Sequence, residues 1–132
     1  MEIKRLREKK DVYRKAVLRL KEALDEDISN PLVYDGVIQR FEFTYELAWK
    51  LMKAYLEYEG IAIVNSPRAA FKEAFKAGLI FEGDVWIDMI GDRNLAAHTY
   101  NEEMAKEIYE RIKEKYFERF VTFGAKMAEV TK

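Results

Sequence analysis

The chain has 132 residues, which is the length of one domain and enough to bury a hydrophobic core without disulfides or metals. Charged residues make up 36% of it but nearly balance at a formal net charge of −1, so the whole chain is no general binder of polyanions. It has no cysteine, which excludes a disulfide framework and a thiolate metal site. No apolar run approaches the roughly 18 residues of a membrane span, and no signal peptide is recognisable. We therefore expect a single cytoplasmic domain over residues 1–132.

The first helix is expected over about Glu2 to Leu24, because apolar residues recur there at helical spacing. This segment is also basic: nine lysines and arginines stand between Met1 and Lys21, against three acids. A solvated basic face is the simpler interpretation. The alternative is a docking surface for RNA phosphate or for an acidic partner.

The second helix is expected from about Pro31 to Glu59, with Asn30 as its N-cap and Gly60 just past its end. It carries two apolar stripes. One stripe consists of Tyr34, Ile38, Phe41, Tyr45, Ala48, Met52 and Tyr55. The other consists of Val33, Val37, Thr44, Leu47, Leu51 and Tyr58. Because one core contact needs only one stripe, we infer that one faces the core and the other a neighbouring subunit.

Three more helices complete the expected fold. Ser66 and Pro67 begin a short one that Gly78 ends. A fourth opens at Gly83-Asp84, with these residues expected to face inward: Trp86, Ile87, Ile90, Leu95 and Ala97. The last helix begins either in a capping box of Thr99 with Glu102 or at a competing cap, Asn101, and runs to about Ala128. No segment alternates convincingly as a strand. The sequence therefore predicts an all-α, up-and-down bundle of four main helices and a short one.

The junction before the last helix holds the candidate site. Arg93 and His98, the only histidine, are five positions apart, which on one continuous helix separates them by about 140°. They can converge only if the helix ends between them or if a second copy of the chain contributes. A guanidinium can hold phosphate oxygens, and an imidazole can exchange a proton near neutral pH. A lone histidine near a helix start is, however, more often a packing or capping residue.

Cleaving RNA through its own 2′-hydroxyl needs both an acid and a base. One histidine per chain supplies one such group, and a two-fold homodimer would supply two. This requirement agrees with the spare apolar stripe on the second helix.

Two acidic patterns adjoin this segment. Asp84, Asp88 and Asp92 share one helix face, which we expect to meet Lys or Arg from another helix or a partner; a metal site is the weaker alternative. Glu42 and Glu46 are one turn apart on the second helix. They are expected to form surface ion pairs, unless Glu46 or Arg40 lines the same cleft as Arg93.

Three blocks of this sequence resemble a known family. Arg93-x4-His98-x-Tyr100 is similar to the signature of the HEPN superfamily. The wider block from Asp92 to Asn101 resembles its branch of nucleotidyltransferase substrate-binding proteins, as do residues 35–50, which include RFEFTYELAWK, and Ser66-Pro67-Arg68 followed by a short helix. The resemblance covers about residues 6–120, and the three blocks in this order are its specific feature.

The resemblance implies a helical homodimer and a separate small nucleotidyltransferase partner. It also implies a metal-independent ribonuclease of toxin type without a cofactor, in which Arg93 and His98 are the catalytic pair. Tyr100 would accept AMP from the partner, and Asp92 and Asn101 would belong to the same binding or modification site. The alternative is a non-catalytic subunit that presents substrate to the transferase.

Overall fold

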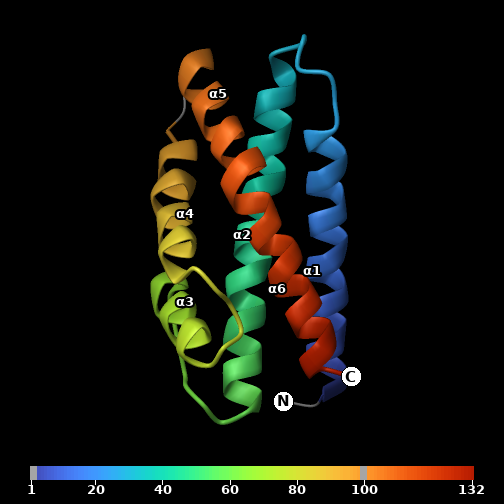
Figure 1. The fold of residues 1–132 in the computed structure, drawn as a ribbon, viewed down its shortest axis with the longest axis vertical. Coiled ribbons are helices and arrows are strands. Elements are labelled where there is room, and N and C mark those ends of the chain that lie inside the picture. Colours follow the sequence, from blue (N-terminus) through green and yellow to red (C-terminus); the bar gives the residue numbers. More distant parts are fainter. Residues whose placement is uncertain (1–2, 99–100) are drawn as a thin grey trace.

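In the computed structural model, which describes residues 3–98 and 101–132, all regular secondary structure is helical (Figure 1). Helix α1 spans Ile3–Leu24, α2 Leu32–Tyr58, α3 Pro67–Lys76, α4 Gly83–Ala96 and α5 Glu102–Arg111. A π-helical turn, η1 (Ile112–Tyr116), joins α5 to α6 (Phe117–Val130). The predicted all-α bundle is confirmed. None of the helices in the described part of the chain has the length and apolar character needed to cross a membrane.

Helix α2 is the centre of the bundle, and it contacts α1, α3, α4 and α5 (Figure 1). An aromatic cluster fills the space between α2, α3, α4 and α6. Phe41 stacks on Tyr116 at 5.6 Å between ring centroids, and Trp86 meets Phe71 at 5.2 Å and Phe120 at 5.6 Å. These five side chains are almost fully buried, and each contributes on the order of 1.5–3 kcal/mol relative to exposure. The cluster holds the first turns of α4 against the rest of the bundle.

The two apolar stripes on α2 do not divide between the core and another subunit as predicted. The first stripe faces the core as expected. Much of the second is covered within the chain itself, because α1 packs along α2: Val37, Thr44 and Leu51 are buried, and the Thr44 hydroxyl lies 3.4 Å from the Ala16 carbonyl of α1. The inference that this stripe as a whole faces another subunit is therefore wrong. An aromatic residue on neither stripe, Phe43, is 53% exposed.

The predicted helix ends are largely confirmed. The Ser66 hydroxyl accepts a hydrogen bond from the Ala69 amide at 3.2 Å and caps α3. Gly60 and Gly78 have φ of +68° and +76°, the left-handed conformation that follows a helix end. The side chain of Asn30 accepts from the Leu32 amide at 3.0 Å, as expected of the predicted N-cap, although α2 itself begins at Leu32, one residue later than expected.

The C-terminal helix contains a feature that the sequence did not predict. Its middle widens into the π turn, where the Phe117 amide donates to the carbonyl of Ile112, five residues back. This wider turn interrupts the α-helical register, and both Arg111 before it and Tyr116 within it reach α4. Single π turns inside α-helices are often found at functional sites.

Candidate functional site

The inward face of α4 includes a carboxylate. Its buried residues are Val85, Trp86, Met89 and Asp92. This line continues to the half-buried Ala96, so Leu95 and Ala97 lie beside it and are exposed. The prediction that those two residues face inward is wrong. Ile87 and Ile90, also predicted to face inward, are half-buried.

Asp92 is held by two residues of the C-terminal helix. Arg111 donates from Nε to Oδ2 at 2.8 Å and from Nη2 to Oδ1 at 2.7 Å, a bidentate pair. The Tyr116 hydroxyl donates to Oδ2 as well. Burial, the hydrogen bond to Asp92 and its negative charge together raise the pKa of Tyr116 well above its usual value, so the phenol stays a donor. Asp92 therefore ties α4 to the π turn.

The expectation for the acidic face of α4 is confirmed at two of its three positions. Asp92 meets Arg111, and Asp88 lies 3.8 Å from Lys115 of η1. Within residues 3–98 and 101–132, no group of three or more carboxylates and imidazoles is placed to hold a metal ion. Asp88 and Asp92 thus serve contacts between helices.

Arg93 follows Asp92 but points to another helix. Its Nη1 lies 3.6 Å from Oε2 of Glu42 on α2, and its Nε is buried without a hydrogen-bond partner. The charge of Arg93 also acts on Tyr45, whose pKa burial nevertheless raises to about 12. α2 therefore provides an anionic neighbour for the guanidinium, whose side chain remains 30% exposed.

The residue that meets Arg93 is Glu42 rather than Glu46 or Arg40. Glu46 instead accepts a hydrogen bond from Trp49 Nε1 at 3.0 Å and lies 3.9 Å from Lys50. Surface ion pairing is therefore confirmed for Glu46. The alternative placed Glu46 or Arg40 beside Arg93, but the residue found there is Glu42.

α4 ends between Arg93 and His98, as the sequence required. The helix stops at Ala96, and the His98 amide still donates to the Leu95 carbonyl at 3.0 Å. The His98 side chain is exposed. Both residues lie at the same end of α4, and the charged neighbour of the Arg93 guanidinium is Glu42. A single chain therefore supplies the helix boundary that the sequence predicted between Arg93 and His98.

The next helix begins at a cap that the sequence offered as the competing choice. Asn101 Oδ1 accepts from the Met104 amide at 2.8 Å, so α5 starts at Glu102. Thr99 and Tyr100 lie outside the described residues, and with them the predicted capping hydroxyl and the predicted acceptor of AMP. Asn101 has a structural role in capping, whatever else it contacts.

Sequence reasoning missed two residues near this site, Arg111 and Tyr116. Neither has a local signature, because each acts through a carboxylate about twenty residues earlier in the chain. The available signal was Asp92 itself, an acidic residue at helical spacing from the apolar residues that α4 buries. Such a residue requires a cationic or hydrogen-bonding partner from another helix.

Comparisons with known proteins support one family. Residues 8–129 match the model of a family described as nucleotidyltransferase substrate binding protein like. A Haemophilus influenzae protein named probable ribonuclease HepT is 38% identical over 81 residues, which cover 58% of this chain and only 56% of that relative.

Solved structures share the fold along nearly the whole chain. A protein from Thermus thermophilus is 30% identical with a TM-score of 0.75, over 91% of this chain and 98% of that one. A tri-AMPylated Shewanella oneidensis HEPN toxin, in complex with an MNT antitoxin, has a TM-score of 0.76 over 98% of each chain. At 21% identity, this second likeness shows the fold alone.

Proposed function

Because the chain belongs to the family of nucleotidyltransferase substrate binding protein-like chains, we propose that it is the HEPN-type partner of a small nucleotidyltransferase in a toxin–antitoxin pair. The solved HEPN toxin of the same fold in complex with its MNT antitoxin supports this proposal. So does the relative named as a probable ribonuclease. We further propose that residues 1–132 form one HEPN-like domain.

The activity proposed for this domain is metal-independent cleavage of RNA. The 2′-oxygen forms a bond to phosphorus, the bond from phosphorus to the 5′-oxygen breaks, one proton leaves the 2′-hydroxyl and another joins the leaving oxygen. Arg93 would hold the phosphate and stabilise its developing charge, and His98 would take or give a proton. The observation that carries the proposal is the end of α4 between these residues, which leaves the imidazole exposed beyond the helix that bears the guanidinium.

A homodimer completes this scheme, since it brings a second imidazole. Two large apolar side chains, Val12 of α1 and Phe43 of α2, are 52% and 53% exposed and are available for such a contact. The molecular mass in solution, measured by light scattering, tests the dimer. A monomer at every concentration would remove the second proton donor from the mechanism.

Activity is tested on RNA in the presence of a chelator, with the wild type beside His98→Ala and Arg93→Ala. Loss of cleavage in both variants is expected, and equal cleavage by all three proteins would refute the catalytic pair. Modification is tested by incubation with the partner transferase and ATP. In that reaction the Tyr100 phenol would lose its proton and its oxygen would bond to the α-phosphorus of ATP, while the bond from that phosphorus to the bridging oxygen breaks and pyrophosphate leaves. Mass spectrometry of the wild type and Tyr100→Phe then locates the added AMP.

A second candidate is a non-catalytic subunit that presents substrate to the transferase. The contact between Arg93 and Glu42 favours it, because a paired guanidinium is partly neutralised before any phosphate arrives. This candidate predicts that the purified chain leaves RNA intact and that adding it changes the rate of the partner transferase.

A further inference from the structure

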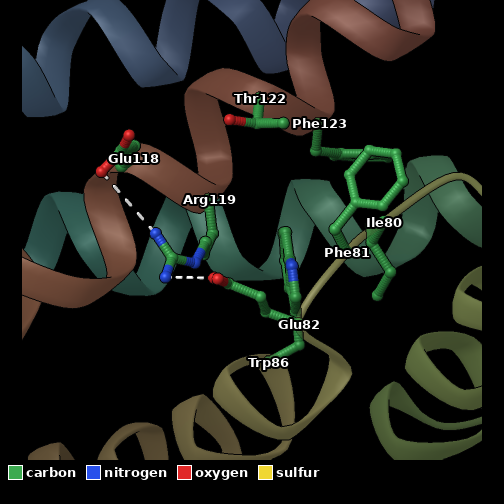
Figure 2. A pocket seen from close by; sticks show the side chains of 8 residues that line it. All are labelled: Ile80, Phe81, Glu82, Trp86, Glu118, Arg119, Thr122 and Phe123. Carbon is green, nitrogen blue, oxygen red and sulfur yellow. Dashed lines mark ion pairs between the residues drawn. The ribbon is translucent and has the colours of Figure 1, made fainter.

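A pocket of about 210 Å³ lies at the start of α4 (Figure 2), whereas Arg93 lies in the last turn of that helix. Glu82, which precedes α4, and Arg93 are eleven residues apart, which is about 16 Å along the helix axis at 1.5 Å per residue. The inner wall of the pocket is apolar: Ile80, Trp86 and Phe123 are each at most 2% exposed. Phe81, which is 57% exposed, also lines it.

One cation lies in this pocket, and its hydrogen bonding is incomplete. Arg119 of α6 places Nη2 against the carboxylate of Glu82 and Nη1 3.7 Å from Glu118 (Figure 2). Its Nε is buried and has no hydrogen-bond partner. A buried N–H without a partner is costly, so such a group calls for an explanation.

Arg111 in the same chain shows what this guanidinium lacks. It uses Nε together with Nη2 to bind both oxygens of the Asp92 carboxylate. On the same edge of the Arg119 guanidinium, Nη2 contacts the Glu82 carboxylate but Nε has no hydrogen-bond partner. A carboxylate that approached Arg119 along that edge would satisfy both donors.

Glu82 is held beside Arg119 in an unfavourable backbone conformation. Its φ of 55° and ψ of 55° make it the only non-glycine with positive φ among residues 3–98 and 101–132. Residues with a Cβ rarely adopt this region, and such strain is concentrated at binding and switch sites. Glu82 is also exposed and lies in the connection before α4, so its side chain is free to exchange with a competing anion.

We propose that this pocket binds a small monocarboxylate with a flat apolar body, and that Glu82 occupies the carboxylate position when the ligand is absent. The ligand carboxylate would pair with Nε and Nη2 of Arg119, while its body would lie against Trp86 and Phe123. The volume suits a compound of about the size of benzoate and is below the roughly 300 Å³ at which pockets for drug-sized ligands begin.

Titration with benzoate, followed by tryptophan fluorescence, tests the site directly. Trp86 lines the pocket, and the chain has two tryptophans, so the response must persist in Trp49→Phe. A saturable change with a dissociation constant on the order of 1 mM is expected for so small a ligand. Benzamide, which lacks the charge, and acetate, which lacks the flat body, should each bind at least tenfold more weakly. No saturation by benzoate, or equal binding of benzamide, would overturn the proposal.

Variants then separate the roles of the two charged residues. Glu82→Gln removes the internal competitor and should tighten benzoate binding about two- to fivefold, the range for an exposed ion pair. Arg119→Lys keeps the charge but loses the forked donors, so binding should weaken severalfold, with folding checked by circular dichroism. Glu129→Gln is the matched control, because its 67% exposed side chain on the same helix pairs with Lys126 and does not line the pocket, and its affinity should stay that of the wild type. Weaker binding by Glu82→Gln would contradict the competitor role.

Discussion

Asp92 and Arg93 are consecutive in the sequence but are paired with different helices. Asp92 accepts two hydrogen bonds from Arg111 of α5, whereas Arg93 lies 3.6 Å from Glu42 of α2. One turn of α4 is thereby attached on two sides. These two contacts hold the turn of α4 that carries the Arg93 guanidinium, five residues before the exposed imidazole of His98.

The first prediction concerns the pair of Asp92 and Arg111. Asp92→Ala and Arg111→Ala should each lower the free energy of unfolding by about 1–3 kcal/mol, since each leaves a polar partner unsatisfied. The double variant should lose less than the sum, with a coupling of about 0.5 kcal/mol or more. Urea unfolding of the wild type, the two single variants and the double variant measures this coupling. Strictly additive losses of unfolding free energy would mean that the bidentate contact contributes no stability.

The second prediction concerns the anion beside Arg93. Glu42→Gln removes the charge that competes with substrate phosphate, so kcat/KM for RNA should rise, by up to about fivefold for a partly exposed pair. Glu46→Gln is the control, because Glu46 contacts Trp49 and Lys50 instead. A fall in kcat/KM for Glu42→Gln alone would show that the carboxylate positions Arg93 rather than competing for it.

Much of the fold could be predicted from the sequence because its signals are local. Apolar spacing identified the helices, and the cap at Ser66 and the glycines Gly60 and Gly78 marked ends that the structure confirms. The short loops between these ends then favoured an up-and-down bundle. These signals depend on the chemistry of neighbouring residues, which any single sequence displays.

The features that escaped prediction depend on residues far apart in the chain. The sequence predicted a basic partner for the acidic face that includes Asp92, but neither the burial of Asp92 nor the identity of its partner, Arg111, because these depend on how α5 packs against α4. The burial of Thr44 likewise depends on how α1 packs along α2. The pocket at Arg119 joins the connection before α4 to α6, and no local pattern relates those segments. Tertiary packing decides all three.

The third prediction concerns alkaline pH. Burial raises the pKa of Tyr13, Tyr45 and Tyr116 above the ordinary value of 10, and that of Tyr45 to about 12. Because the folded state keeps these phenols protonated, their contribution to stability is complete below pH 10. It is lost as the pH rises through the folded-state pKa, which for Tyr45 means between pH 10 and about 12.

Urea unfolding at pH 8, 10 and 11 measures this dependence. Each such tyrosine should steepen the fall in unfolding free energy above pH 10 by up to about 1.4 kcal/mol per pH unit. Tyr45→Phe should flatten the fall by up to that amount. An unchanged slope in that variant would show that Tyr45 ionises equally in both states.

The last prediction separates stability from function at two helix caps. Asn101→Ala and Ser66→Ala each remove a side chain that accepts from a backbone amide, so each should cost about 1 kcal/mol of unfolding free energy. Asn101 is three residues from His98, and its cap sets where α5 begins after the candidate site, whereas Ser66 caps α3. RNA cleavage should therefore fall in Asn101→Ala and stay at the wild-type rate in Ser66→Ala at a temperature where both are folded. Equal activity of the two variants would show that the start of α5 does not help to position the imidazole.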